Sequence, residues 1–114
     1  MQASQIDPET KQAVRAFIEK ITLQYDLFGV ILFGSRARHT HRADSDADVA
    51  VLLKGTPGNF IETRFALIDI AYDVLLDTGI LIQPLPIWKT EWDHPANYRN
   101  PQLIENIHRE GISL

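Results

Sequence analysis

The sequence predicts an α/β domain: a small mixed sheet of about three strands, flanked by helices and followed by a helical C-terminal tail. Three apolar runs of strand length, Val30–Phe33, Val49–Leu53 and Ile80–Ile87, alternate with longer stretches of helical periodicity. The chain has 114 residues, of which 45% are hydrophobic and 23% charged, as in an ordinary globular domain. We therefore expect residues 1–114 to form a single domain.

Composition argues against several function classes. The net charge of −4 provides no basic field, so direct binding of a long nucleic acid is not expected. The absence of cysteine excludes a disulfide scaffold and thiolate zinc sites, which suits a reducing compartment. No stretch reaches eighteen apolar residues, and the N-terminus lacks the basic and apolar regions of a signal peptide. We expect a cytoplasmic protein without membrane association.

The first element expected is an amphipathic helix. Asp7 followed by Pro8 is typical of an N-cap and a first helical position. Apolar residues then recur at helical spacing as far as about Tyr25, and charged residues occupy the other side. The apolar set is Val14, Phe17, Ile18 and Ile21, and the charged set is Lys11, Arg15 and Glu19. This helix should pack on the sheet.

The central stretch joins two strands through a polar connection. The run Val30–Phe33 ends at Gly34 and Ser35, and ten residues later Asp46 and Asp48 precede the second apolar run. The Gly-Ser pair and the Asp pair can act together if the end of the first strand lies beside the start of the second. That requires either that the two strands are antiparallel neighbours or that the loop folds back. A short helix over Arg36 to His39, capped by Ser35, would present free N–H groups that favour phosphate.

The residue types in this stretch predict a metal and phosphate site. Side chains alternate along a strand, so Asp46 and Asp48 should share one face, roughly 6.6 Å apart along the backbone. Two carboxylates suit Mg²⁺, which takes one or two carboxylates together with substrate phosphates. Gly34 lets the backbone approach an anion, and Ser35 adds a hydroxyl. Arg36 has the planar donor geometry that suits phosphate oxygens. Arg38 and Arg42 either do the same or pair with neighbouring acids.

A dense turn signal at residues 54–59 precedes a second long helix, Phe60–Thr78, which Gly79 should end. We expect its apolar stripe to face the core. This stripe comprises Phe65, Ile68, Tyr72 and Leu75, with Ile61 one turn earlier. The acids Glu62, Asp69, Asp73 and Asp77 should form a solvated face, although one of them as a third metal ligand is the alternative.

The last third of the chain supplies a strand and a helical tail. Prolines in Ile80–Ile87 indicate an edge strand or a strand end. The tail, Trp88–Leu114, contains a final helix that Asn100 and Pro101 open and Gly111 ends. Its aromatic residues suit either a partner-docking surface or core packing, and the sequence does not decide between them.

At Gly34 to Asp48 the sequence resembles the polymerase-β-like nucleotidyltransferases, whose signature G-S-x10-D-x-D it matches with strands on both sides. The short length resembles the minimal nucleotidyltransferases (MNT), antitoxins of HEPN/MNT toxin–antitoxin pairs. The resemblance implies a minimal polymerase-β-like fold, Mg²⁺ held by Asp46 and Asp48, and ATP phosphates held by Gly34 and Ser35, with Arg36 beside them. It also implies transfer of AMP from ATP to a tyrosine of a HEPN toxin, in a hetero-oligomer.

The chain departs from the fuller family pattern at one position. Many members carry a third carboxylate on the strand that here contains Gln83, and a neutral amide adds no charge and cannot act as a carboxylate base. One alternative is therefore a catalytically weak or inactive antitoxin that neutralises its partner by binding. Another is a transferase that acts on a small molecule such as an antibiotic, although the chain is short for an acceptor pocket.

Overall fold

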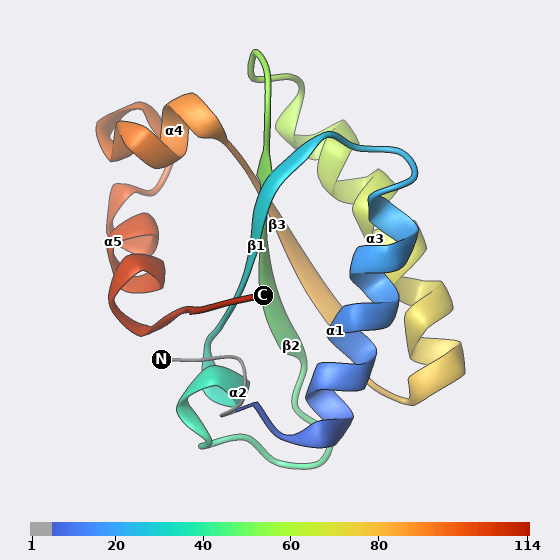
Figure 1. The fold of residues 1–114 in the computed structure, drawn as a ribbon. Helices are drawn as coiled ribbons and strands as arrows, with labels where there is room; N and C mark the ends of the chain where they lie inside the picture. The colour runs from blue at the N-terminus through green and yellow to red at the C-terminus, as the bar shows by residue number, and fades with distance from the viewer. Residues whose placement is uncertain (1–5) are drawn as a thin grey trace.

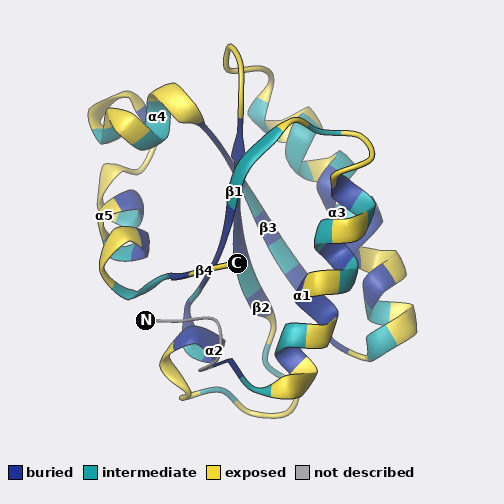
Figure 2. Ribbon diagram, in the orientation of Figure 1, coloured by how far each residue is buried: buried dark blue, intermediate teal, exposed yellow. Residues whose placement is uncertain are grey.

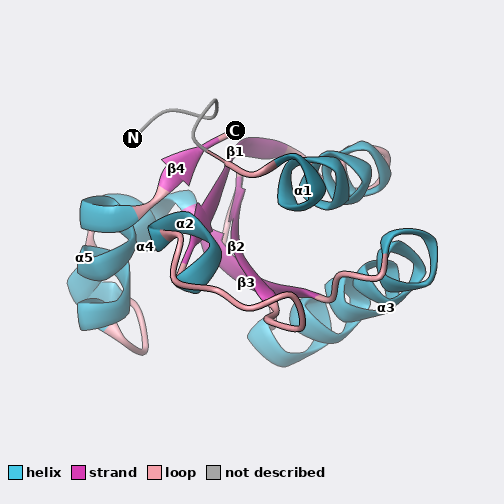
Figure 3. Ribbon diagram, turned by 90° about the horizontal axis from the view of Figure 1, so that it is seen from below, coloured by secondary structure: helices cyan, strands magenta, loops and turns pink. Residues whose placement is uncertain are grey.

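The computed structural model describes residues 6–114 as three layers, with a four-stranded sheet between two layers of helices (Figure 1; Figure 3). The predicted α/β class, with a small mixed sheet, flanking helices and a helical tail, is confirmed. The elements in chain order are α1 (Pro8–Ile21), β1 (Leu27–Phe33), α2 (Ser35–Arg38), β2 (Ala47–Leu53), α3 (Phe60–Thr78), β3 (Ile82–Trp88), α4 (Lys89–Asp93), a short 3₁₀ helix (Pro95–Asn97), α5 (Pro101–Glu110) and β4 (Ile112–Ser113). The two-residue strand β4 is not predicted by the sequence.

Local signals place most helix ends correctly. The Asp7 side chain accepts a hydrogen bond from the Thr10 N–H at 3.1 Å, as expected of the N-cap of α1. This helix ends at Ile21, four residues before the predicted end. The bounds of α3 are those predicted, and Gly79 ends it in the left-handed conformation with φ of 79°.

The sheet order β3-β2-β1-β4 brings the polar connection to one end of the sheet. Strands β1 and β2 are antiparallel neighbours, which is the first of the two arrangements that bring the parts of the motif together, and Phe33 lies opposite Asp48. Strand β3 runs parallel to β2 with Gln83 opposite Asp48, and it forms the sheet edge that its prolines indicate. The end of β1 and the starts of β2 and β3 therefore meet at the same place.

The sheet separates two hydrophobic cores. Alternate residues of β1 and β2 contribute to opposite faces, as strand geometry requires. Much of the central strands is buried, whereas most of the exposed residues are in the helices and connections (Figure 2). Val30, Leu32 and Val49 pack toward α1 and α3, whereas Ile31 and Ala50 pack toward the helices of the tail. Of the tail aromatics, Trp88 and Tyr98 are buried in these cores, so they contribute to packing.

The predicted orientation of α3 is wrong. Ile61, Phe65 and Tyr72 were expected to face the core, but all three are exposed. The buried residues of the helix are Leu67, Ile70, Ala71 and Val74. Because α3 carries apolar residues on most of its circumference, periodicity alone does not select the stripe that the core covers. The acids Glu62, Asp69, Asp73 and Asp77 are solvent-exposed, as predicted.

None of the helices in residues 6–114 has the length and apolarity needed to span a bilayer.

Candidate nucleotidyl-transfer site

The Gly34–Ser35 turn lies directly against the second aspartate of the motif. Gly34 follows β1 and adopts φ of 75°, in the region that favours glycine. A Cβ built on Gly34 would overlap Oδ2 of Asp48. Residues 34 and 48 are thus in contact although fourteen positions separate them. The antiparallel pairing of β1 and β2 produces this contact, since it sets Phe33 opposite Asp48.

The two carboxylates have different surroundings. Asp46 is exposed and precedes β2, whereas Asp48 is the second residue of the strand and is half-buried. Burial raises the pKa of the Asp48 carboxyl, and the neighbouring Asp46 charge raises it further, while the Arg38 charge opposes the shift. Two carboxylates close enough to repel each other, beside a turn that leaves no room for a Cβ, fit the requirements of a divalent cation.

Gln83 of β3 lies beside both aspartates of the motif. Its Nε2 donates a hydrogen bond of 3.0 Å to Oδ2 of Asp46. Its backbone is paired with Asp48. Over residues 6–114, no group of three or more acidic, histidine or cysteine side chains is arranged to hold a metal ion. The protein groups suited to a cation here are therefore Asp46 and Asp48, with an amide beside them.

The short helix after the turn begins one residue earlier than predicted. Gly34 is the N-cap of α2 and Ser35 is its first residue, so Ser35 makes no side-chain cap. The helix ends at Arg38, and the C-cap residue His39 adopts the left-handed conformation, with φ of 60°. Ser35 is partly exposed at the turn, so Gly34 and Ser35 remain the residues proposed to contact a phosphate.

The expected role of Arg36 is not consistent with its position. Arg36 is only 2% exposed. Its guanidinium donates hydrogen bonds to backbone oxygens of the loop before β2 and to the hydroxyl of Thr10 in α1. The acceptors are Ser45 O at 2.8 Å, Ala43 O at 3.2 Å and Thr10 Oγ1 at 2.8 Å. Arg36 therefore holds the loop that leads to Asp46, and its donors are not free for a phosphate.

Two charged residues, Arg38 and Glu110, lie beside the Gly34–Ser35 turn. Oε1 of Glu110 accepts a hydrogen bond from the Gly34 N–H at 3.3 Å and from Nη1 of Arg38 at 3.0 Å. The Arg38 side chain is 49% exposed, so it is the arginine of α2 that solvent and a ligand can reach. Glu110 comes from the end of α5, 76 residues after Gly34, and no spacing in the sequence indicates this approach.

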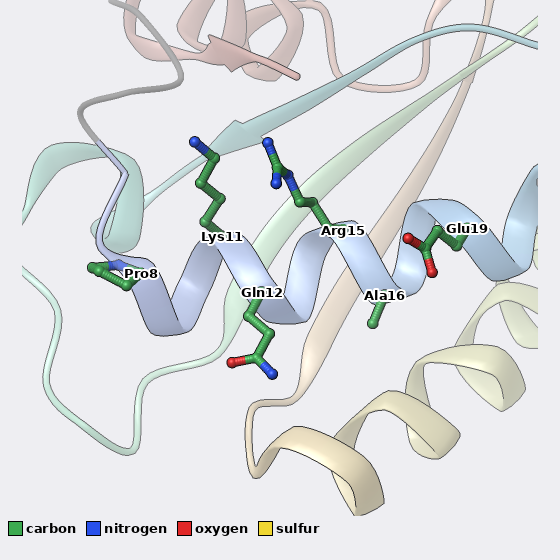
Figure 4. A pocket seen from close by; sticks show the side chains of 6 residues that line it. All are labelled: Pro8, Lys11, Gln12, Arg15, Ala16 and Glu19. Atoms are coloured by element: carbon green, nitrogen blue, oxygen red, sulfur yellow. The ribbon is translucent and has the colours of Figure 1, made fainter.

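A separate surface hollow of about 430 Å³ lies along the outer side of α1 (Figure 4). Its lining residues are Pro8, Lys11, Gln12, Arg15, Ala16 and Glu19. None of the predicted site residues contributes to it. This hollow is therefore separate from the candidate site at the end of the sheet.

Comparisons with known proteins agree with the fold and the motif. The family described as "Nucleotidyltransferase domain" matches residues 12–112. A Methanocaldococcus jannaschii protein named "putative protein adenylyltransferase" is 37% identical over 71 residues, covering 60% of this chain and 48% of that protein, so the chain spans about half its length. A Sulfolobus solfataricus crystal structure described as a "putative nucleotidyltransferase" has a similar fold, with a TM-score of 0.50 and 21% identity over 76% of this chain and 80% of that one. On a family match over nearly its whole length, this chain belongs to the nucleotidyltransferase domain family.

Proposed function

We propose that this nucleotidyltransferase moves AMP from ATP to a hydroxyl of another protein, with Mg²⁺ as its cofactor. The observation that carries the proposal is the contact between Gly34 and the Asp48 carboxylate. This contact supports the proposal because the turn proposed to bind phosphate lies directly against one of the two carboxylates proposed to bind the cation. A metal–triphosphate complex needs both, since its phosphates carry the negative charge and its ion needs oxygen ligands.

Each residue has a defined part in the proposed site. Asp46 and Asp48 hold Mg²⁺, which when bound neutralises charge on the phosphates and polarises the α-phosphorus. Gly34 and Ser35 contact the phosphates through backbone N–H groups and the hydroxyl. Arg38 takes the part first assigned to Arg36, because its exposed guanidinium lies within electrostatic reach of Asp48. A phosphate that uses the Gly34 N–H must displace the Glu110 carboxylate.

The transfer is a single displacement. The acceptor hydroxyl oxygen forms a bond to the α-phosphorus of ATP, and the bond from that phosphorus to the bridging oxygen of the β-phosphate breaks. Pyrophosphate leaves with the bonding electrons, and the hydroxyl proton passes to solvent. The site residues bind and orient the reactants and offset the charge that develops on the leaving group.

The proposed acceptor is a tyrosine of a HEPN toxin, which would make the chain an antitoxin that works in a cytoplasmic hetero-oligomer. A protein acceptor is supported by the name of the M. jannaschii relative, which refers to protein adenylylation. The MNT role is supported by the motif spacing from Gly34 to Asp48.

The test is to incubate the purified chain with ATP, Mg²⁺ and a co-encoded HEPN protein, and to measure the intact mass of both proteins. We expect the partner to gain the mass of one AMP. The variant Asp46→Asn/Asp48→Asn should keep its circular dichroism spectrum and lose the transfer, because both proposed metal ligands are neutralised.

Asp44→Asn is the matched control, since this exposed carboxylate lies two residues before Asp46 and is not one of the proposed metal ligands. It should transfer AMP at the rate of the unmodified chain. Transfer that survives the double substitution would contradict the mechanism.

A second candidate function is neutralisation by binding alone. The observation that favours it is the hydrogen bond from Gln83 to Asp46, which engages a proposed metal-ligand oxygen with an amide instead of adding a charged ligand. In that case the partner gains no mass, while the unmodified chain and the Asp46→Asn/Asp48→Asn variant form equally stable complexes and silence it equally.

A further inference from the structure

We infer that the outward face of α3 is a docking surface for an amphipathic helix of another protein, whose apolar stripe is bordered by lysine or arginine. The surface consists of Ile61, Phe65, Tyr72 and Leu76, here called the α3 stripe. It lies on the side of α3 opposite the buried residues of that helix, and none of its residues belongs to the candidate site. The helix α3 lies beside α1, on the face of the sheet away from α4 and α5 (Figure 3). The inference goes beyond nucleotidyl transfer and does not depend on it.

The α3 stripe is exposed along nearly the whole helix. The exposed fractions are 50% for Ile61, 63% for Phe65, 56% for Tyr72 and 69% for Leu76. At about 100° and 1.5 Å per residue, the four side chains occupy a sector of about 60° and a length of about 22 Å. Single exposed apolar side chains are ordinary, but an aligned set of large ones indicates an interaction site.

The charge beside the α3 stripe defines the partner. Glu62, Asp69, Asp73 and Asp77 are all exposed and occupy the neighbouring sector of the helix, from about 80° to 160° when Ile61 is set at zero. Across residues 6–114, none of these four carboxylates takes part in a salt bridge. A partner with basic side chains beside its own apolar stripe would complement this acidic row.

A helix fits the shape of the surface better than the alternatives. The α3 stripe is a narrow ridge, and the groove between two rows of side chains on another helix accepts such a ridge. A second copy of the chain in antiparallel packing would set two acidic rows on the same side, where like charges repel. An anionic membrane surface would be repelled by the same four carboxylates.

The test uses two synthetic helical peptides that share one leucine stripe. One peptide has lysine and arginine beside the stripe, and the other has glutamate at the same positions. Binding to the purified chain is measured by fluorescence anisotropy, without ATP or metal, so the result is independent of the transfer reaction. We expect the basic peptide to bind at least about tenfold more tightly than the acidic one, and the preference to shrink as salt rises.

Variants assign the binding to α3. Phe65→Ser/Tyr72→Ser should weaken binding of the basic peptide by at least about tenfold, because aromatic side chains dominate such contacts. Asp69→Asn/Asp73→Asn should weaken it several-fold and only at low salt. Leu23→Ser is the matched control: this side chain is 85% exposed but lies in the turn after α1, so binding should not change. All substituted residues are exposed, and circular dichroism should confirm that each variant is folded.

Three outcomes would overturn the inference. The first is equal binding of the two peptides, which would mean that the four carboxylates of α3 do not favour a basic partner over an acidic one. The second is no binding of the basic peptide at concentrations where the chain is monomeric. The third is a dimer in sedimentation that Phe65→Ser/Tyr72→Ser abolishes, which would identify a second copy of this chain as the occupant.

Discussion

Asp48 is the residue at which the demands of folding and of the candidate site conflict. Its carboxyl is half-buried beside Asp46, and burial, the Asp46 charge and the Glu110 charge all raise its pKa above the ordinary value of 3.8. A carboxylate in such a place destabilises the folded chain when it is ionised without a cation. The same charge is what a divalent cation would bind.

We predict that Asp48→Asn stabilises the metal-free protein at neutral pH. Because the folded-state pKa is raised, the cost of ionised Asp48 appears as pH rises from 3.8 through the folded-state pKa and is complete above it. The substitution should increase the free energy of unfolding at pH 7 by on the order of 1 kcal/mol or less. Urea denaturation in EDTA measures this. The gain should vanish below pH 3.8, and a gain that persists there would mean that titration is not its cause.

Gly34 illustrates a second constraint at the residue scale, since the conformation and the space at this position both require glycine. We predict that Gly34→Ala lowers the free energy of unfolding by about 2 kcal/mol. The cost of placing alanine at positive φ and the cost of the steric overlap between its Cβ and Asp48 add together. Gly79→Ala is the matched control: its φ of 79° is similar, but nothing lies within 4 Å of the added Cβ. It should cost only about 1 kcal/mol. Equal losses in thermal or urea denaturation would contradict the Asp48 contact.

At the scale of elements, α2 serves the loop that carries Asp46. The helix has four residues, too few to be stable without tertiary contacts. Arg36 supplies those contacts by donating to Ser45 O, Ala43 O and Thr10 Oγ1. Since Thr10 also donates to Oδ1 of Asp7, the start of α1, the short helix and the loop form one hydrogen-bonded unit.

We predict that Arg36→Met destabilises the protein by about 2–4 kcal/mol, because the substitution leaves the buried Thr10 hydroxyl and the part-buried carbonyl oxygens of Ala43 and Ser45 without the Arg36 donors. Arg38→Met removes a guanidinium from the same helix that is half-exposed, so it should cost less than about 1 kcal/mol. Urea denaturation of the two variants compares them directly. If Arg38→Met alone impairs ATP binding at constant stability, the arginine that contacts phosphate is Arg38, as proposed.

At the scale of the whole molecule, the two cores share one sheet. Strands β1 and β2 contribute alternate residues to both cores, so neither core can form without the strands of the other. The radius of gyration is 13.2 Å, close to the value of about 13 Å expected for one compact domain of this length. We therefore propose that the chain folds as a single domain, with residues 1–5 outside the described part.

The chain should accordingly unfold in one cooperative transition. Trp88 is buried in the core under α1 and α3, and Trp92 packs against the core under the tail. The variants Trp92→Phe and Trp88→Phe each leave one tryptophan, so their fluorescence reports the two cores separately. Their urea transitions, each compared with far-ultraviolet circular dichroism of the same variant, should coincide. Fluorescence that changes before circular dichroism in either variant would show that the cores unfold independently.

Local chemistry made most of the fold predictable from the sequence. Asp7, Pro8 and Gly79 mark helix ends through their own backbone and side-chain properties, and apolar runs mark three of the four strands. The spacing from Gly34 to Asp48 indicated the family, which the comparison then confirmed. The roles of individual site residues stay predictions, because no ligand contact tests them.

Other features depend on contacts between distant parts of the chain. The sequence determined that α3 exists, but because the helix is apolar on most sides, only packing against the sheet decided that Leu67 and Val74 are buried while Phe65 is exposed. Because Arg36 follows Ser35 directly, the sequence predicts that it contacts a phosphate. In the fold its side chain is buried, and its guanidinium donates to the loop before β2 instead. Glu110 reaches Gly34 because α5 and β4 return along β1, a path 76 residues long that no local pattern encodes. Local chemistry sets the elements and the motif, whereas long-range packing sets which side chains remain free to act.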